Sequence, residues 1–253
     1  MARSPLVTRT LIVTGASRGI GAAIARAAGR EYAVLVNYSD DSEPARRVVR
    51  DILAEGGQAA AFRADVSNED HVRAMFDAAA QLGPLAGIVN NAGITGNTPG
   101  RLDEQDAGTV RRTLEVNVLG VFLCARAAVR RLSTVHGGEG GSIVNISSTA
   151  AKRASAGEWV HYAASKAAVE TLTVGLAEEV GPEGIRVNCV APGTVHTGLH
   201  EAAGMPDRLE RVAPLIPLRR AGDPEEIAEG VLWLLSPAAS FVTGAVLPIS
   251  GGR

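Results

Sequence analysis

The stretch TLIVTGASRGIG, from Thr10 to Gly21, decides the fold. Its first four residues are a short apolar run that predicts a β-strand, and the Ala-rich pattern from Ala22 to Arg30 predicts a helix. The glycines between them allow a tight turn and a close approach of the backbone to a phosphate, and the helix offers free N–H groups and the positive end of its dipole. The stretch therefore predicts a nucleotide-binding unit, although its G-x-x-x-G-x-G spacing differs from the commoner G-x-G-x-x-G of dinucleotide sites.

Further β runs alternate with helical patterns along the rest of the chain. They are Tyr32 to Asn37, Gln58 to Ala64, Leu85 to Val89, Ser142 to Ile146, Ile185 to Val190 and Ala245 to Ile249. Such alternation without internal repeats is typical of a doubly wound parallel sheet with helices on both faces. We therefore expect a single α/β dinucleotide-binding domain over residues 1–253, with a sheet of seven strands.

The composition argues against several classes of partner. The chain has 253 residues, of which 46% are hydrophobic and 21% charged, as in an ordinary soluble protein. Its net charge is −2 and its basic residues are scattered, so we expect neither nucleic acid nor a membrane surface as a partner. The polar start and the lack of a long apolar stretch predict a cytoplasmic protein. Cys124 and Cys189 lie in apolar segments, which suits buried thiols, and the histidines lack ligand spacing, so no metal site is expected.

The end of the second strand bears on the choice of cofactor. An NAD-binding unit normally has an acid here for the ribose 2′-hydroxyl, whereas this chain has Asn37, within the neutral sequence Asn37-Tyr38-Ser39. Arg18 in the glycine turn supplies a cation that could pair with a 2′-phosphate. Asp40 and Asp41 count mildly against this, although they can equally begin the next helix. We therefore expect NADP(H) to be preferred and NAD(H) to be possible.

Three more places carry polar groups that could serve a site. Asn90-Asn91-Ala92-Gly93 follows the fourth strand, where small residues permit close approach by a ligand. Ser147 and Ser148 follow the fifth strand, where a hydroxyl could meet a substrate or simply end the strand. Asn117 lies inside an apolar helical stretch from Asp103 to Ser133, as a hydrogen-bonded core amide or a catalytic group.

Tyr162 and Lys166 are four residues apart in a helical run from Trp159 to Gly181, so both side chains should lie on one face. A nearby ammonium favours the phenolate and lowers the pKa of a phenol, which could then act as a general acid or base. The alternative is a solvated surface pair. A cofactor site and a hydroxyl beside the pair would favour the catalytic interpretation.

Taken in order, these residues resemble the short-chain dehydrogenases/reductases, over nearly the whole chain from Thr10 to Gly252. The matching positions are Thr14-Gly15-x-x-x-Gly19-x-Gly21, Asp65, Asn90-Asn91-Ala92-Gly93, Asn117, Ser148, Tyr162-x-x-x-Lys166, and Pro192-Gly193 with Thr197. Members similar to this chain are of the 3-oxoacyl-[acyl carrier protein] reductase and the sugar or alcohol dehydrogenase types. The resemblance implies a Rossmann-type fold, a nicotinamide cofactor and a catalytic tetrad.

In that tetrad, the resemblance implies that Ser148 hydrogen-bonds the substrate carbonyl oxygen and that Tyr162 exchanges a proton with it. Lys166 would lower the pKa of Tyr162 and hold the nicotinamide ribose, and Asn117 would fix a water or backbone group that relays protons. The family's serine usually lies one residue closer to the tyrosine, so Ser147 and Thr149 stay open as alternatives. A one-residue insertion between Ala150 and Glu158 is the simplest account.

The resemblance also implies which residues bind the cofactor. They are Gly15, Ser17, Arg18, Gly19, Ile20, Gly21, Asn37, Tyr38, Ser39, Asp65, Val66, Asn91, Ala92, Gly93, Tyr162, Lys166, Pro192, Gly193, Val195 and Thr197.

We therefore expect an NADP(H)-dependent reductase of a ketone or 3-oxoacyl compound. The alternatives are an NAD-linked alcohol or sugar dehydrogenase working oxidatively and a non-catalytic nucleotide-sensing protein, against which the complete tetrad argues. The segment 194–216 is irregular and long, which is typical of a substrate lid. The substrate, a small molecule, should also meet Thr95 to Pro99 and Thr149 to Val160.

Two helices predict self-association. The runs Trp159 to Gly181 and Asp103 to Ser133 are apolar around much of their circumference, and only one face of each can pack on the sheet. We expect a homotetramer in which these helices meet their symmetry mates. The resemblance suggests that Glu225 to Leu235 and Ala245 to Ile249 form a second interface.

Overall fold

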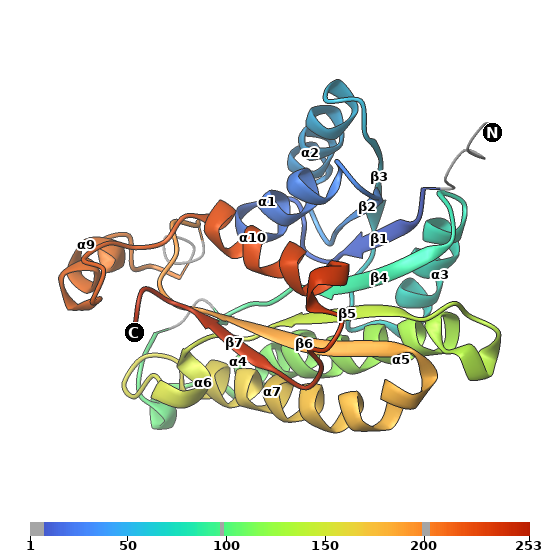
Figure 1. Cartoon of the computed structure of the whole chain (residues 1–253). Helices are drawn as coiled ribbons and strands as arrows, with labels where there is room; N and C mark the ends of the chain where they lie inside the picture. The colour runs from blue at the N-terminus through green and yellow to red at the C-terminus, as the bar shows by residue number, and fades with distance from the viewer. Residues whose placement is uncertain (1–7, 97–98, 199–202) are drawn as a thin grey trace.

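The computed structural model describes residues 8–96, 99–198 and 203–253. Its centre is one parallel sheet in the order β3-β2-β1-β4-β5-β6-β7 (Figure 1). The strands are β1 (Thr10–Val13), β2 (Ala33–Tyr38), β3 (Gln58–Arg63), β4 (Leu85–Asn90), β5 (Gly141–Ile146), β6 (Ile185–Pro192) and β7 (Val246–Ile249). The predicted seven-stranded doubly wound sheet is confirmed.

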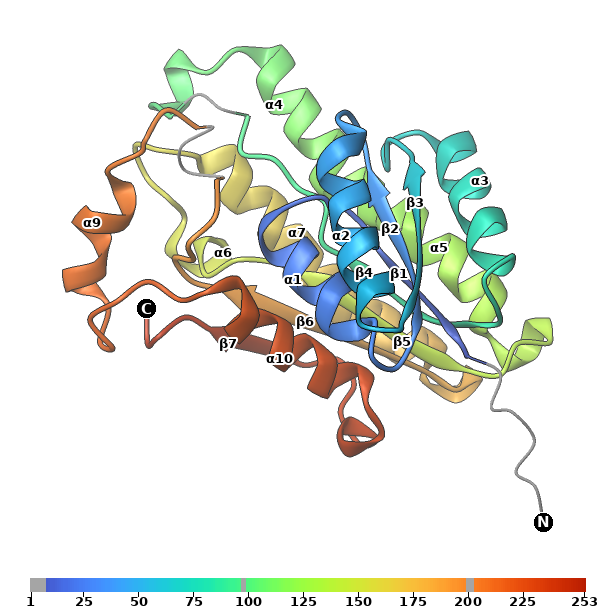
Figure 2. The same ribbon diagram turned by 90° about the horizontal axis from the view of Figure 1, so that it is seen from above.

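Helices cover both faces of this sheet (Figures 1 and 2). One layer contains α1 (Gly19–Ala28), α2 (Ser42–Ala54) and α10 (Pro224–Leu235), and the other contains α3 (Glu69–Ala80), α4 (Ala107–Leu114), α5 (Gly120–Leu132) and α7 (Val160–Val180). Two short helices, α6 (Ala150–Arg153) and α9 (Arg208–Val212), belong to loops at the carboxyl edge of the sheet. Short 3₁₀ turns cover Leu102–Glu104, Thr134–His136, Gly181–Glu183, Ala213–Leu215 and Pro237–Ala239.

A separate apolar core lies under each helical layer. Ile24 of α1 and Val231 of α10 are fully buried against strand residues such as Val36 on one face. Phe76 of α3 and Leu132 of α5 are buried against Ile143 on the other. Central strands buried on both faces explain why their sequences are continuous apolar runs rather than alternating ones.

The strand order reverses between β1 and β4, because the chain continues from β1 to β2 on one side and from β4 to β5 on the other. In open α/β sheets, ligands bind outside the carboxyl ends of the strands at such a switch point. The glycine turn follows β1 and the Asn-Asn-Ala-Gly segment follows β4, so both lie at this crevice.

The long helix expected from Asp103 to Ser133 is present, but it begins only at Ala107 and is not a regular α-helix throughout. The chain instead forms α4, then a π-helical turn at Glu115–Leu119, and then α5. The turn contains Asn117, whose amide bonds the main chain of Ile94 outside the helix. Hydropathy along the chain does not report such a contact, and a π turn is a common feature of functional sites.

Gly87 gives a direct test of the sheet packing. A Cβ at this position of β4 would lie 2.1 Å from the main-chain oxygen of Ser142 on β5. We expect Gly87→Ala to lower the free energy of unfolding by about 2–3 kcal/mol, as overpacking of a core does. Urea denaturation would measure it. The matched change Gly181→Ala, where a Cβ meets nothing within 4 Å, should leave stability nearly unchanged, and equal losses in both variants would contradict this account.

Candidate active site

The structure brings Asn117, Ser148, Tyr162 and Lys166 together from three segments: the π turn, the end of β5 and α7. The Ser148 hydroxyl hydrogen-bonds the Tyr162 phenol, and the Lys166 ammonium lies 5.7 Å from the centroid of the same ring. A Cβ added at Gly93 would lie 3.2 Å from Lys166 Nζ and 3.3 Å from Asn117 Oδ1. A glycine here therefore leaves room between β4 and these two polar groups.

Of the neighbouring serines, Ser148 faces the tyrosine. Ser147 is buried, and its hydroxyl lies 2.9 Å from Glu170 Oε1 and 3.2 Å from the main-chain oxygen of Lys166. Ser148 Oγ also accepts a hydrogen bond of 3.1 Å from the N–H of Ala150. The Ser147 hydroxyl therefore bonds α7 and holds β5 against that helix.

The loop where an extra residue was expected contains strained backbone. Ala154 and Ser155 have positive φ angles of 63° and 46°, which non-glycine residues rarely adopt. They lie between α6 and Glu158. Ser148 meets Tyr162 at the two ends of this segment, and the one-residue insertion within it stays a prediction.

Asn117 is buried and bonded to the chain around it. Its Oδ1 accepts from the N–H of Ile94 at 2.8 Å, and its Nδ2 donates to the Ile94 oxygen at 2.8 Å and to Ser165 Oγ at 2.9 Å. The amide therefore fixes the segment after β4 relative to α7. It is a satisfied core group that lies directly beside the site.

Burial dominates the ionisation of the tyrosine–lysine pair. It lowers the pKa of Lys166 to about 8, and Nζ donates a hydrogen bond of 2.8 Å to the Ile146 oxygen. It raises the pKa of Tyr162, against which the Ser148 hydrogen bond and the charge of Arg208 act. The expectation that Lys166 lowers the pKa of Tyr162 is therefore wrong for this structure, because Lys166 lies over the ring and bonds Ile146 rather than the phenol oxygen.

The glycine turn packs directly on the segment after β4. Gly15 and Gly19 have φ angles of 61° and 55°, and a Cβ at Gly15 would lie 2.9 Å from the Ala92 Cα. Asn91 Nδ2 donates to the oxygens of Thr14 and Gly15 at 2.8 and 3.1 Å. Larger residues in this turn would separate β1 from β4.

Asn37 was expected to face the crevice, but the structure turns its side chain into the interior. Its side chain is buried, with Oδ1 accepting from the Gly15 N–H at 3.2 Å and Nδ2 donating to the Ala64 oxygen at 3.0 Å. Alternation along β2 turns Asn37 inward and leaves the half-buried Tyr38 as the residue at the strand end. Asp41 caps α2 by accepting from the Glu43 N–H at 2.9 Å, as the alternative assignment proposed.

Arg63 is a residue that the sequence did not single out. It ends β3 in register with Tyr38, and its Nε donates a hydrogen bond of 2.9 Å to the Ser39 oxygen. Arg18 is exposed at the N-terminus of α1. Within the described part of the chain neither arginine has an ion pair; Arg63 lies beside the end of β2, and Arg18 belongs to the glycine turn that bonds the main chain of Asn37. Only the strand register places Arg63 there.

Asp65 and Val66 follow β3 at the same edge. Asp65 accepts from the Ser67 N–H at 2.9 Å and from Arg112 at 2.8 Å. Burial opposes ionisation of Asp65, but these hydrogen bonds outweigh it and lower its pKa. Val66 is buried where Gly120 lets α5 approach it closely.

The segment after β6 closes the other side of the crevice. A Cβ at Gly193 would lie 2.8 Å from the Ser250 Cα, so Pro192-Gly193 packs tightly on the chain after β7. Val195 is buried, and the methyl group of Thr197 lies 3.3 Å from the position of a Cβ at Gly19. Thr197 therefore contacts the glycine turn from across the crevice.

The expected lid divides into two described parts, 194–198 and 203–216; Leu199 and His200 lie outside the described residues. Its helix α9 carries Arg208, which pairs with Glu158 and stacks on Trp159. Nothing in the sequence alone links these residues. Over residues 8–96, 99–198 and 203–253, the structure has no cluster of His, Cys, Asp and Glu that could hold a metal and no helix apolar and long enough to cross a membrane.

Comparisons with known proteins match nearly the whole chain. A family described as Enoyl-(Acyl carrier protein) reductase matches residues 15–253. An uncharacterized oxidoreductase, YgfF, of Escherichia coli is 48% identical over 96% of this chain and 98% of its own. A 3-oxoacyl-[acyl-carrier-protein] reductase of Staphylococcus aureus is 38% identical over 97% of this chain and 98% of its own.

Solved structures agree in fold. A short-chain dehydrogenase from Burkholderia cenocepacia in complex with NADP has a TM-score of 0.85 and 37% identity, and covers 97% of each chain. A 7α-hydroxysteroid dehydrogenase, complexed with NADH and 7-oxo glycochenodeoxycholic acid, has a TM-score of 0.88 and 34% identity, and covers 100% of this chain and 98% of its own.

The position of Asn37 predicts a stability effect. We expect Asn37→Ala to lower the free energy of unfolding by about 1–3 kcal/mol, because it leaves the half-buried Gly15 N–H and the buried Ala64 oxygen without their side-chain partner. Ser39→Ala at the exposed strand end serves as the control and should change stability by less than about 0.5 kcal/mol. A stable Asn37→Ala protein that has lost only cofactor affinity would contradict the structural role.

Proposed function

Because the chain belongs to the short-chain dehydrogenase/reductase family, whose similar members are oxidoreductases, we propose that it is an NADP(H)-dependent reductase of ketones or 3-oxoacyl compounds. The observation that carries the proposal is the joined pair of hydroxyls of Ser148 and Tyr162 beside the buried Lys166. Two hydroxyls that meet can both hydrogen-bond one substrate oxygen. They are thus suited to a carbonyl group that becomes an alcohol.

The crevice fits a nicotinamide dinucleotide. Gly15 and Gly21 leave backbone where a Cβ would clash, and the N-terminus of α1 offers N–H groups to a pyrophosphate. Gly93 leaves room beside Lys166 and Asn117 for the nicotinamide ribose. When bound, the cofactor supplies the hydride for reduction.

The protein's own groups then handle the proton. Tyr162 has a raised pKa, so its hydroxyl is protonated at neutral pH and can give its proton to the substrate oxygen. Ser148 donates a hydrogen bond to the same oxygen as negative charge develops there. Lys166, with a pKa of about 8, is largely an ammonium at neutral pH, and Asn117 holds the segment that faces it.

The proposed preference for NADP(H) rests on charge at the end of β2. Tyr38 stands where an acid would favour NAD(H), and Arg18 and Arg63 supply positive charge for a 2′-phosphate. Asp40, an exposed acid bonded to Ser39, favours the alternative of an NAD-linked dehydrogenase working oxidatively. The free, buried thiols of Cys124 and Cys189 fit the reducing cytoplasm that we propose as the location.

The acid/base role predicts the effect of a one-atom change. We expect Tyr162→Phe to keep the fold and cofactor binding and to lose nearly all turnover, since only the proton-transferring hydroxyl is removed. Tyr32→Phe, just before β2 and at its opposite end from the crevice, is the matched control and should keep most of its kcat. Steady-state kinetics on ketones, 3-oxoacyl thioesters, sugars and steroids, followed by loss of reduced-cofactor absorbance, would measure both.

Ser148→Ala should lower kcat by about 100-fold or more, and Ser147→Ala should mainly lower stability. Retention of more than about a tenth of kcat in Tyr162→Phe, or a larger kcat loss in Ser147→Ala than in Ser148→Ala, would refute the assignment. A wild-type protein that binds the cofactor but reduces nothing in the panel would favour a nucleotide sensor.

Cofactor choice has a separate test. Arg18→Ala and Arg63→Ala should each weaken NADPH binding about tenfold or more and leave NADH binding nearly unchanged, because only the phosphate is lost as a partner. Titration of cofactor fluorescence gives both dissociation constants. Arg30→Ala, beyond the far end of α1, is the control. Equal affinity of the wild type for NADPH and NADH would contradict the preference.

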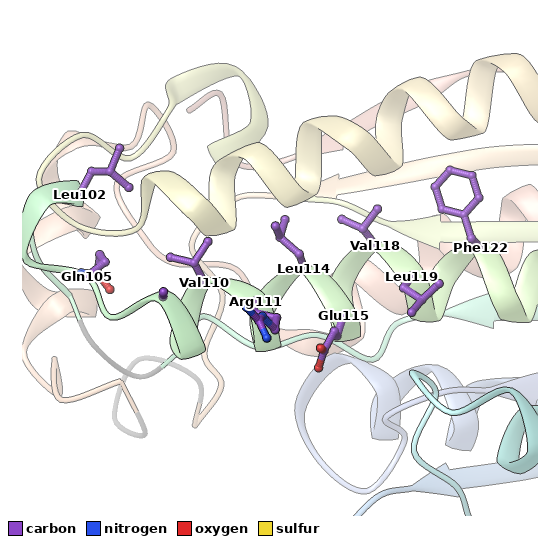
Figure 3. A pocket seen from close by; sticks show the side chains of 10 residues that line it. Leu102, Gln105, Val110, Arg111, Leu114, Glu115, Val118, Leu119 and Phe122 are labelled. Atoms are coloured by element: carbon purple, nitrogen blue, oxygen red, sulfur yellow. The ribbon is translucent and has the colours of Figure 1, made fainter.

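We also propose that the protein is a homotetramer. An apolar groove runs along α4, the π turn and α5, lined chiefly by Leu102, Val110, Leu114, Val118, Leu119 and Phe122 (Figure 3). Leu119 and Phe122 are 46% and 48% exposed. Large apolar side chains gathered on one face indicate a protein contact, and a second copy of the same helices matches them. Trp233 of α10, 43% exposed, supports the second interface near β7.

Light scattering coupled to gel filtration at micromolar concentration tests the assembly. We expect a mass near four times the 26.1 kDa of one chain. Phe122→Glu should reduce that mass, because it places a charge in the apolar contact, while Val135→Glu, at an exposed apolar residue beyond α5, should leave it unchanged. A wild-type mass near 26.1 kDa would refute the tetramer.

A further inference from the structure

The lid contributes a shielded ion pair beside the candidate catalytic tyrosine. Arg208 Nη1 of α9 bonds Glu158 Oε1, and the guanidinium carbon lies 5.0 Å from the centroid of the Trp159 ring. The two charged side chains are 16% and 29% exposed. Among the ion pairs of the described residues this one is the most shielded; Arg211 and Asp207, on the same short helix, are 54% and 62% exposed.

The pair is fixed to the start of the catalytic helix. Glu158 and Trp159 directly precede α7, which carries Tyr162 in its first turn. The main-chain oxygen of Glu158 also accepts a hydrogen bond of 2.9 Å from the Gly100 N–H, in the segment after β4. Glu158 therefore joins three walls of the site: the loop after β4, the start of α7 and, through Arg208, the lid.

Stability alone does not explain this arrangement. Burying two charges costs desolvation that an apolar contact would avoid. In the described part of the chain, Arg208 Nε and Trp159 Nε1 are also buried without a hydrogen-bond partner, a cost that folded proteins rarely accept. Buried charges that lower the stability of the fold are found most often at functional sites.

The positive charge of Arg208 acts on the Tyr162 phenol. The charged groups near the Tyr162 phenol are Lys166 of α7, Arg208 of α9 and Glu158, which pairs with Arg208; Ser148 at the end of β5 bonds the phenol itself. Lys166 is bonded to Ile146, and it is the charge of Arg208 that acts to lower the pKa of Tyr162.

We propose that Arg208 is a positioning residue that couples docking of the lid to proton transfer: docked on Glu158 and Trp159, it places a positive charge beside the Tyr162 phenol. The proposal rests on Tyr162 acting as the acid/base of the proposed function. When the phenol O–H bond breaks and its proton moves to the substrate oxygen, the phenolate that remains is stabilised by this charge. When α9 leaves Trp159 the charge leaves with it, so the phenol gives up its proton readily only under a docked lid.

Trp159 is a built-in reporter of docking. The chain has two tryptophans, so Trp233→Phe leaves Trp159 as the single emitter, and it is 3% exposed. In that background, Arg208→Gln and Glu158→Gln should roughly double the acrylamide quenching constant of Trp159 or raise it further, since each releases the lid. Arg211→Gln, the matched control on the same helix, should not change it. The exchange Arg208→Glu with Glu158→Arg should restore the low value.

The Tyr162 titration tests the coupling. The chain has three tyrosines, so the phenolate absorbance of each variant minus that of its Tyr162→Phe counterpart isolates Tyr162. Arg208→Gln should move this titration to higher pH. Glu158→Gln is the sharper test: if Arg208 stays in place, loss of a negative charge moves the titration to lower pH, whereas release of Arg208 moves it to higher pH.

Unchanged quenching in both Arg208→Gln and Glu158→Gln would overturn the docking contact. Raised quenching with an unmoved Tyr162 titration, or a Glu158→Gln titration moved to lower pH, would overturn the coupling. Neither measurement needs substrate or cofactor. Failure of the proposed function in the turnover assay is therefore distinguishable from failure of this proposal.

Discussion

The contact between the glycine turn and the segment after β4 is the constraint on which the rest of the structure depends. A side chain at Gly15 would meet the Ala92 Cα at 2.9 Å, and Asn91 bonds the main chain of Thr14 and Gly15 across the gap. This contact joins β1 to β4 at the point where the strand order reverses. It places a helix N-terminus, a glycine-lined crevice and the carboxyl ends of β4 and β5 within reach of one ligand.

The side chains of the candidate active site are then held by contacts from several elements. Asn117 binds both main-chain groups of Ile94, and the Lys166 ammonium bonds the Ile146 oxygen. Ser147, next to Ser148, ties β5 to Glu170 of α7. A site assembled in this way keeps its geometry because moving any one side chain leaves buried polar groups unsatisfied.

The seven strands and the helices between them could be predicted from the sequence because short apolar runs and glycine turns are local signals. The direction of a side chain is harder to predict from the sequence, because a shift of one residue along a strand turns the side chain to the opposite face. For this reason the prediction placed Asn37 in the crevice, whereas its side chain lies in the interior. The position of Arg63 beside the cofactor crevice follows only from its register with Tyr38. The position of Arg208 near the candidate site follows only from the packing of α9 on Trp159. The π turn at Asn117 accompanies a hydrogen bond from Ile94. The periodicity of apolar residues along the helix does not indicate that bond.

Burial makes conflicting demands on a site of this kind. A phenol shielded from water keeps its proton and can donate it at neutral pH, but the phenolate left behind is then costly, as the raised pKa of Tyr162 indicates. Burial also destabilises a cation fixed beside the ring, as the pKa of about 8 for Lys166 indicates. Under the proposed docking of α9, Arg208 resolves the conflict differently, because its desolvation accompanies docking and need not be borne by the rest of the fold. Shielding from water and stabilisation of the phenolate then arise in one step, since the element that covers the site also brings the charge.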